Sequence, residues 1–123
     1  MMKFLAVGTG GFLGSMLRYA MTFLPLSVKS GLPVNTLLIN FIGSFLLGLI
    51  SLIAFRSEGS DVYMKLFLTI GLCGGFTTFS TFALENVNLI FAGKHLVALT
   101  YILCSIGSCI IGIIAAKMLV DLM

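Results

Sequence analysis

A run of aromatic rings and hydroxyl groups stands inside an otherwise apolar stretch of the sequence. Phe76, Phe79 and Phe82 recur at every third position, so in a helix they lie along one face. Hydroxyl side chains fill the positions beside these rings, at Thr77, Thr78, Ser80 and Thr81. The edge of an aromatic ring is electropositive and can face an anion where water is excluded. The pattern indicates a candidate anion path, against the ordinary alternative of rings that only fill a core or face lipid.

Two adjacent glycines, Gly74 and Gly75, come directly before this run and after Cys73. Each glycine weakens a helix by about 1 kcal/mol relative to alanine, and the hydroxyls that follow offer the backbone other hydrogen-bond partners. These residues predict a break in the helix just after Cys73. Freed carbonyls at such a break are natural ligands for a hard cation. The alternative is a continuous helix whose glycines mark a tight helix crossing.

Three further polar or charged side chains lie in the apolar stretches, Asn40 and Arg18 in other stretches and Glu85 just past the aromatic run. Asn40 either bonds a neighbouring helix or donates its NH2 group to an anion, because an amide in hydrocarbon needs a partner. Glu85 serves proton coupling or hydrogen bonding around a pore, unless it lies close enough to the end of its helix to reach water. Arg18 attracts anions into a vestibule, pairs with an acid, or extends its side chain to the surface.

Tyr101, Ser105 and Cys109 recur four residues apart and share one helical face, either as a polar edge or as ordinary packing. The cysteines Cys73, Cys104 and Cys109 lack the paired spacing of a zinc or redox motif, so we expect them to pack as small buried side chains. The sequence offers neither a pair of nucleophile and base nor a cluster of metal-ligating residues. An enzyme is therefore not expected.

The composition predicts the elements that position these side chains. Of 123 residues, 59% are hydrophobic and 9% are charged, whereas roughly a quarter are charged in soluble domains. Because a helix needs about 20 apolar residues to cross a bilayer, we predict one all-α membrane domain over residues 1–123 with four transmembrane helices. The helices are expected at residues 4–24, 35–55, 66–91 and 98–118, the third broken in mid-membrane. Pairs of small residues, glycine or serine, at helical spacing predict an oligomer. The scattered basic residues exclude a nucleic-acid partner.

The basic residues are divided almost equally between the two sides of such a four-helix chain. One side would carry Lys3, Arg56, Lys65 and Lys117, and the other Lys29, Lys94 and Arg18. An excess of lysine and arginine on one side normally fixes the orientation of a membrane protein. A chain without that excess can insert both ways and pair with its inverted copy, as an antiparallel dual-topology homodimer. The alternative is a single orientation set by a weak bias.

Several motifs together resemble the CrcB, or Fluc, family of fluoride channels. They are Gly71-Leu72-Cys73-Gly74-Gly75-Phe76-Thr77-Thr78-Phe79-Ser80-Thr81-Phe82, Glu85, Asn40 and the stretch 10–19. The resemblance runs nearly end to end. It implies a passive channel that exports fluoride from the cytoplasm, located in the lipid bilayer of the bacterial plasma (inner) membrane as a multi-pass protein. It also implies an antiparallel homodimer with two pores along the subunit interface.

The same resemblance assigns roles to individual residues. It implies a structural sodium ion on the two-fold axis, held by the backbone carbonyls of Gly74 and Thr77 from each subunit. The fluoride pore would be lined by Asn40, Phe79, Phe82, Ser80, Thr81, Tyr101 and Ser105. Arg18 would attract anions at the vestibule, and Glu85 would belong to the polar network at the end of the pore. Cys109 departs from the pattern, because another hydroxyl is expected at its position.

Two other classes of protein remain as alternatives. A proton-coupled exporter of the small-multidrug type is also a four-helix, dual-topology dimer, but its essential membrane acid lies in the first helix. This chain has Arg18 and no acid there, so Glu85 would have to take that role. The third class is a helical assembly partner without transport activity, for which the helix rich in phenyl rings and hydroxyls would be an unexplained loss of stability.

Overall fold

The computed structural model describes residues 1–26, 28–56 and 61–122, and every regular element in these ranges is a helix. Helix α1 spans Met2–Met21, α2 spans Val34–Arg56 and α6 spans His95–Asp121. The helical segment between α2 and α6 consists of α3 (Val62–Leu66), the π-helix η1 (Phe67–Cys73), α4 (Gly74–Phe76) and α5 (Phe79–Phe91). We refer to residues 62–91 as the third segment. The predicted all-α class is confirmed, and the observed bounds differ from the predicted ones by a few residues.

Three stretches of the described chain are long and apolar enough to cross a membrane. They are Val34–Ala54 with 21 residues, Val62–Phe91 with 30 residues and His95–Asp121 with 27 residues. Helix α1 is not among them, because Gly8, Gly10, Gly11, Gly14 and Arg18 lower its hydropathy. The fourth crossing, by α1, therefore stays a prediction.

Glycines bring α1 into backbone contact with the third segment. Gly10 and Gly14 are the buried residues of α1. On the opposite side of this contact, a Cβ atom added to Gly71 would lie 2.8 Å from the carbonyl oxygen of Val7, and one added to Gly75 would lie 2.6 Å from that of Gly11. Real Cβ atoms do not approach a backbone so closely. Only glycine fits at this crossing, as close packing of membrane helices requires.

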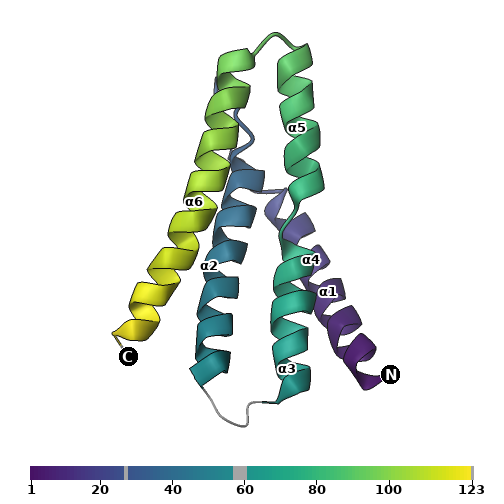
Figure 1. Ribbon diagram of the computed structural model, residues 1–123. Helices are drawn as coiled ribbons and strands as arrows, with labels where there is room; N and C mark the ends of the chain where they lie inside the picture. Colours follow the sequence, from purple (N-terminus) through teal and green to yellow (C-terminus); the bar gives the residue numbers. More distant parts are fainter. Residues whose placement is uncertain (27, 57–60, 123) are drawn as a thin grey trace.

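A second close contact joins α2 to α6. A Cβ atom on Gly48 would lie 3.1 Å from the Cβ atom of Ala116, and one on Gly112 would lie 3.3 Å from the carbonyl oxygen of Phe41. Figure 1 shows the result as two pairs, α2 beside α6 and α1 beside η1 and α4. The first and the last residues of the described chain lie at the same end of the molecule (Figure 1).

The turn after α5 is closed by a glycine with a left-handed backbone. Gly93 has φ 72°. Its N–H donates to the carbonyl of Ile90 at 3.0 Å, and the N–H of Lys94 donates to that of Leu89 at 2.9 Å. This pair of bonds is the Schellman motif, which satisfies the last carbonyls of a helix. It lets α6 begin immediately, at His95.

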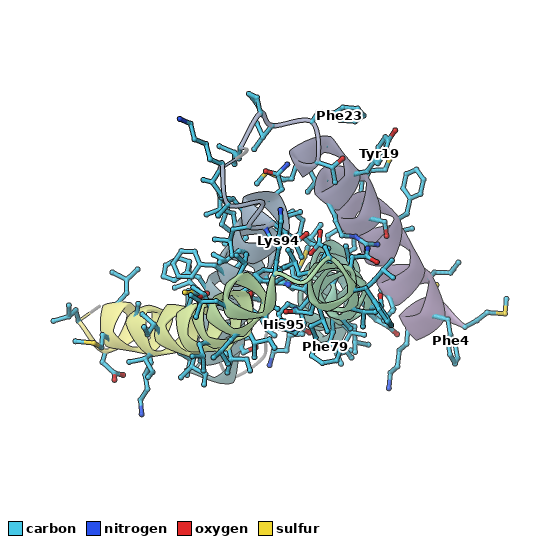
Figure 2. All side chains as sticks on the ribbon, turned by 90° about the horizontal axis from the view of Figure 1, so that it is seen from above. Phe4, Tyr19, Phe23, Phe79, Lys94 and His95 are labelled. Atoms are coloured by element: carbon cyan, nitrogen blue, oxygen red, sulfur yellow. The ribbon has the colours of Figure 1, made fainter. Side chains whose placement is uncertain are left out.

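Large apolar side chains cover most of the outer surface of the single chain. Seen from above, α1 and α6 extend to opposite sides of the central pair α2 and α5 (Figure 2). Phe4 on α1 is 84% exposed, and Phe91 at the end of α5 is 88% exposed. So much apolar surface needs lipid or another protein to cover it.

Candidate functional site

The helical backbone of the third segment is interrupted at Thr77 and Thr78. Thr77 has φ −74° and ψ 158°, and Thr78 has φ −150° and ψ 110°, both extended conformations. The Thr77 N–H and hydroxyl both donate to the carbonyl of Cys73 at 3.0 Å. On the other side, the Thr78 hydroxyl accepts a bond from the Thr81 N–H at 3.2 Å, as the N-cap of α5. The two threonines thus close one helix and open the next.

Asn40 of α2 pairs with both backbone groups of Thr78. Its amide nitrogen donates to the Thr78 carbonyl at 3.1 Å, and its amide oxygen accepts from the Thr78 N–H at 2.8 Å. In a continuous helix this N–H would donate to the carbonyl of Gly74 instead. The bond to a neighbouring segment, one of the two roles expected for Asn40, is the one that the structure contains. The amide nitrogen carries a second hydrogen, which is available to a ligand.

Asn40 and the interruption line a groove of about 300 Å³ between α2, α5 and α6. The lining residues come from all three helices and from the interruption: Asn40, Ser44, Leu47, Thr77, Thr78, Phe79, Phe82, Ser105, Ile106 and Cys109. None of these described residues carries a charge. The groove offers hydroxyls, an amide and ring edges to a ligand.

The two phenyl rings of the groove differ in their surroundings. Phe82 is 8% exposed, and its centroid lies 5.1 Å from that of the fully buried Tyr101. Phe79 is 79% exposed, and its centroid lies 5.6 Å from that of Phe82. Figure 2 shows Phe79 on the side of α5 that points away from α1. Phe76 is buried and does not line the groove, because the extended threonines change the helical phase between Phe76 and Phe79.

A carboxylate connects α2, α5 and α6 behind the groove. The Thr36 hydroxyl donates to Glu85 Oε1 at 2.8 Å, and the Tyr101 hydroxyl donates to Oε2 at 2.7 Å. Glu85 is partly buried and Thr36 is 5% exposed. Glu85 thus accepts two hydrogen bonds, and its role beside a pore stays a prediction. Thr36 was not predicted, although its spacing of four residues from Asn40, and of eight from Ser44, places all three on one face of α2.

A second cavity, of about 220 Å³, lies between α1, α2 and the interruption. It is lined by Ser15, Arg18, Tyr19, Thr22, Thr36, Ile39, Thr78 and Thr81. Among the residues that the structure describes, none forms a hydrogen bond or ion pair with the Arg18 side chain. Its pairing with an acid, one of the three expected roles, is therefore not seen in the single chain. The Arg18 side chain instead lines the same cavity as Thr81.

The structure brings the predicted site residues together in two places and leaves two of them on the surface. The groove is lined by Asn40, Thr77, Phe79, Phe82 and Ser105, and the network with Thr36 is formed by Tyr101 and Glu85. Arg18 and Thr81 line the second cavity. Ser80 and Gly74 are exposed on the third segment.

Comparison with known proteins identifies the family. The sequence matches the family described as CrcB-like protein, Camphor Resistance (CrcB), over residues 5–117. The chain belongs to the CrcB family. The resemblance inferred from the motifs is thereby confirmed, and with it the expectation of a multi-pass membrane protein.

Relatives within the CrcB family cover nearly the whole chain. A protein of Ruminiclostridium cellulolyticum named fluoride-specific ion channel FluC is 45% identical over 120 residues, which is 97% of this chain and 92% of the relative. One of the same name from Chlorobium phaeobacteroides is 44% identical over 112 residues, 91% of this chain and 84% of the relative. A third, from Methanococcus aeolicus, is 36% identical over 119 residues, 97% of this chain and 95% of the relative.

Proposed function

We propose that this chain is a fluoride-selective passive ion channel and not an enzyme. The observation that carries the proposal is the groove beside the interruption, whose described polar groups are hydroxyls and an amide set among phenyl rings, with no charged side chain. The relatives of this chain are named fluoride-specific ion channels. Uncharged donors suit this ion, because conduction needs binding strong enough to admit an ion and weak enough to release it.

Each lining group would replace part of the water shell of fluoride. The second hydrogen of the Asn40 amide, the Ser105 hydroxyl and the ring edges of Phe79 and Phe82 are the donors of the groove. Arg18, in the second cavity, would raise the local concentration of anions without standing in the groove itself. A full positive charge inside the groove would hold the ion too tightly for release.

The proposal includes an antiparallel dual-topology homodimer with two pores at its interface. The Phe79 ring is 79% exposed in the single chain, so the groove lacks a wall on that side. A second copy would supply this wall and would cover apolar surface at the same time. The near balance of basic residues between the two ends permits both orientations. In this arrangement the interruption at Thr77 and Thr78 is a helix break in mid-membrane.

A structural sodium ion fits the residues at the interruption. Because the Thr78 N–H donates to Asn40, it does not occupy the carbonyl of Gly74. Gly74 is exposed, and a Cβ atom added to it would meet only the carbonyl oxygen of Thr69, at 3.8 Å, so the face is open to a partner. Backbone carbonyls of Gly74 and Thr77 from two copies would hold sodium, which takes oxygen ligands. The ion would join the two third segments and take no part in conduction.

Fluoride efflux from liposomes tests the proposal. Purified protein is reconstituted into vesicles loaded with potassium fluoride and potassium chloride, and a potassium ionophore supplies the counter-current. We expect fluoride to leave while chloride stays inside. Vesicles that retain fluoride would refute the channel.

The same vesicles separate the channel from a proton-coupled exporter. Glu85→Gln removes the carboxylate that an exporter would protonate, yet retains an amide oxygen that can accept a bond from Thr36 or Tyr101. A channel conducts fluoride without a pH gradient in both the wild type and the variant. Transport that requires a pH gradient and is lost in Glu85→Gln would favour the exporter.

A further inference from the structure

The groove contains a thiol that neither the fold nor the proposed function requires. Cys109 of α6 is partly buried and lines the groove together with Phe79 and Phe82. Cys104, on the same helix, is exposed and does not line the groove. Five residues of an α-helix correspond to a rotation of about 140°, so the two thiols point in different directions. Cys73 is 2% exposed and lies in η1.

A second side chain indicates that a small polar ligand reaches the position of Cys109. Ser105 precedes Cys109 by four residues, which is one helical turn, and lines the same groove. Ser105 is 5% exposed, and its hydroxyl lies near that of Tyr101 but has no partner with hydrogen-bond geometry among the described residues. Buried polar groups in native proteins nearly always have a partner, which is either another protein group or an ordered water. A water or an ion in the groove would give this hydroxyl a partner next to the Cys109 thiol.

We propose that Cys109 is a modification site inside the groove, where a water-soluble thiol reagent attaches and blocks the passage of ions. With a methanethiosulfonate, the Cys109 thiolate attacks the sulfenyl sulfur, a disulfide forms, and methanesulfinate leaves with the electron pair of the broken S–S bond. The thiol proton goes to the buffer. The added group remains between the phenyl rings and the hydroxyls, where it fills space that an ion needs. The blocking effect rests on the proposed channel function, whereas the attachment does not.

The test compares Cys109 with Cys104 in the intact protein in liposomes. Wild type, Cys109→Ser and Cys104→Ser are treated at about pH 8, near the ordinary pKa of a free thiol, with 2-sulfonatoethyl methanethiosulfonate, which does not cross lipid. Peptide mass spectrometry locates the adducts, and fluoride efflux is measured before and after treatment. Protein denatured before treatment, in which all three cysteines react, is the control for complete labelling.

We expect an adduct on Cys109 in the wild type and in Cys104→Ser, with most of the fluoride efflux lost in both. Cys109→Ser, which restores a hydroxyl, keeps its efflux after treatment. An unmodified Cys109 in protein whose denatured form reacts fully would overturn the proposal, and so would a complete adduct with unchanged efflux. If untreated vesicles release no fluoride, the proposed function fails, and the position of the adduct still decides whether the groove admits the reagent.

Discussion

The Asn40 amide forms hydrogen bonds with the N–H and the carbonyl of Thr78, where the helix is interrupted. One side chain of α2 thus takes the role that a helical turn has elsewhere. A buried backbone group without a partner costs about 1–3 kcal/mol. The interruption consequently depends on a residue 38 positions away in the sequence.

Replacement of Asn40 should destabilise the protein. Asn40→Ala leaves both Thr78 groups unpaired, and we expect a lower thermal unfolding temperature in detergent together with a loss of fluoride efflux. Asn40→Asp still accepts the bond from the Thr78 N–H but cannot donate to the carbonyl, so its stability should lie between that of Asn40→Ala and the wild type. Ser44→Ala is the control, because Ser44 lines the same groove one turn further along and the Asn40 pair remains. Equal stability of Asn40→Ala and Ser44→Ala would contradict the proposed role of Asn40.

Substitutions of the two phenyl rings should differ in their effects on fluoride efflux and on the unfolding temperature. Within the single chain Phe79 is exposed and contacts the ring of Phe82, so Phe79→Ile should lower the unfolding temperature less than a substitution of the buried Phe82. It removes one ring edge from the groove, and we expect efflux to fall about tenfold or more, which corresponds to roughly 1.4 kcal/mol on the barrier. Phe82 packs on Tyr101, so Phe82→Ile should lower both efflux and unfolding temperature. Unchanged efflux in Phe79→Ile would remove this ring from the conduction path.

The third segment shows what sequence reasoning could and could not predict for an element. The adjacent glycines indicated a departure from the helix just after Cys73, yet Gly74 and Gly75 have helical backbones in α4, and the extended residues are Thr77 and Thr78. Gly75 instead contacts the backbone of Gly11, as the tight-crossing alternative expected. Glycine permits either conformation, and the extended backbone at Thr78 is paired by the distant Asn40 in addition to the local threonine bonds. The local pattern does not contain the contribution of Asn40.

Alanine substitutions should distinguish glycines that pack from glycines that do not. In Gly75→Ala the new Cβ atom would lie 2.6 Å from the carbonyl oxygen of Gly11. We therefore expect α1 to separate from α4 and the yield of assembled protein in size-exclusion chromatography to drop. Gly8→Ala is the control on the same pair of helices, since no atom lies within 4 Å of its added Cβ. It should be neutral or stabilising by up to about 1 kcal/mol; a loss of yield as large as that of Gly75→Ala would argue against the crossing.

At the scale of the whole molecule, the two ends of the helix bundle carry nearly equal basic charge. Helix α1 begins, and α6 ends, at the end where α2 gives way to the third segment (Figure 1). The opposite end holds the turn between α5 and α6, where the Lys94 ammonium group donates to the Ser30 carbonyl at 3.4 Å. Lysine and arginine counts near the helix ends set membrane orientation, so the proposed dual topology rests on this near balance.

Reporters fused to the C-terminus should be found on both sides of the membrane. A fluorescent protein that matures only in the cytoplasm and a phosphatase active only outside it should both give signal. Addition of three lysines after Met123 should favour the cytoplasmic C-terminus and reduce the phosphatase signal. A wild-type chain with only one active reporter would exclude the antiparallel homodimer and leave the groove to be completed in another way.

The composition predicted the helices, but it did not predict the individual contacts between them. Apolar stretches gave the helices to within a few residues, because the bilayer requires a fixed length of apolar helix. The network of Thr36, Glu85 and Tyr101 was only partly foreseen, since it joins three helices that are distant in sequence. Phe76 was grouped with Phe79 and Phe82, although the extended threonines separate it from them.

The glycine face of α1 has a consequence for how the chain is synthesised. A nascent helix leaves the translocon for lipid according to the transfer free energy of its side chains. Gly10 and Gly14 contribute little to that free energy, and Arg18 opposes insertion. The glycines that pack α1 against the third segment thus make α1 a weak signal for membrane insertion at the stage of synthesis when no later helix is present. We expect α1 to insert into the bilayer only after the third segment has been translated. The orientation of the chain would then be fixed late in its synthesis.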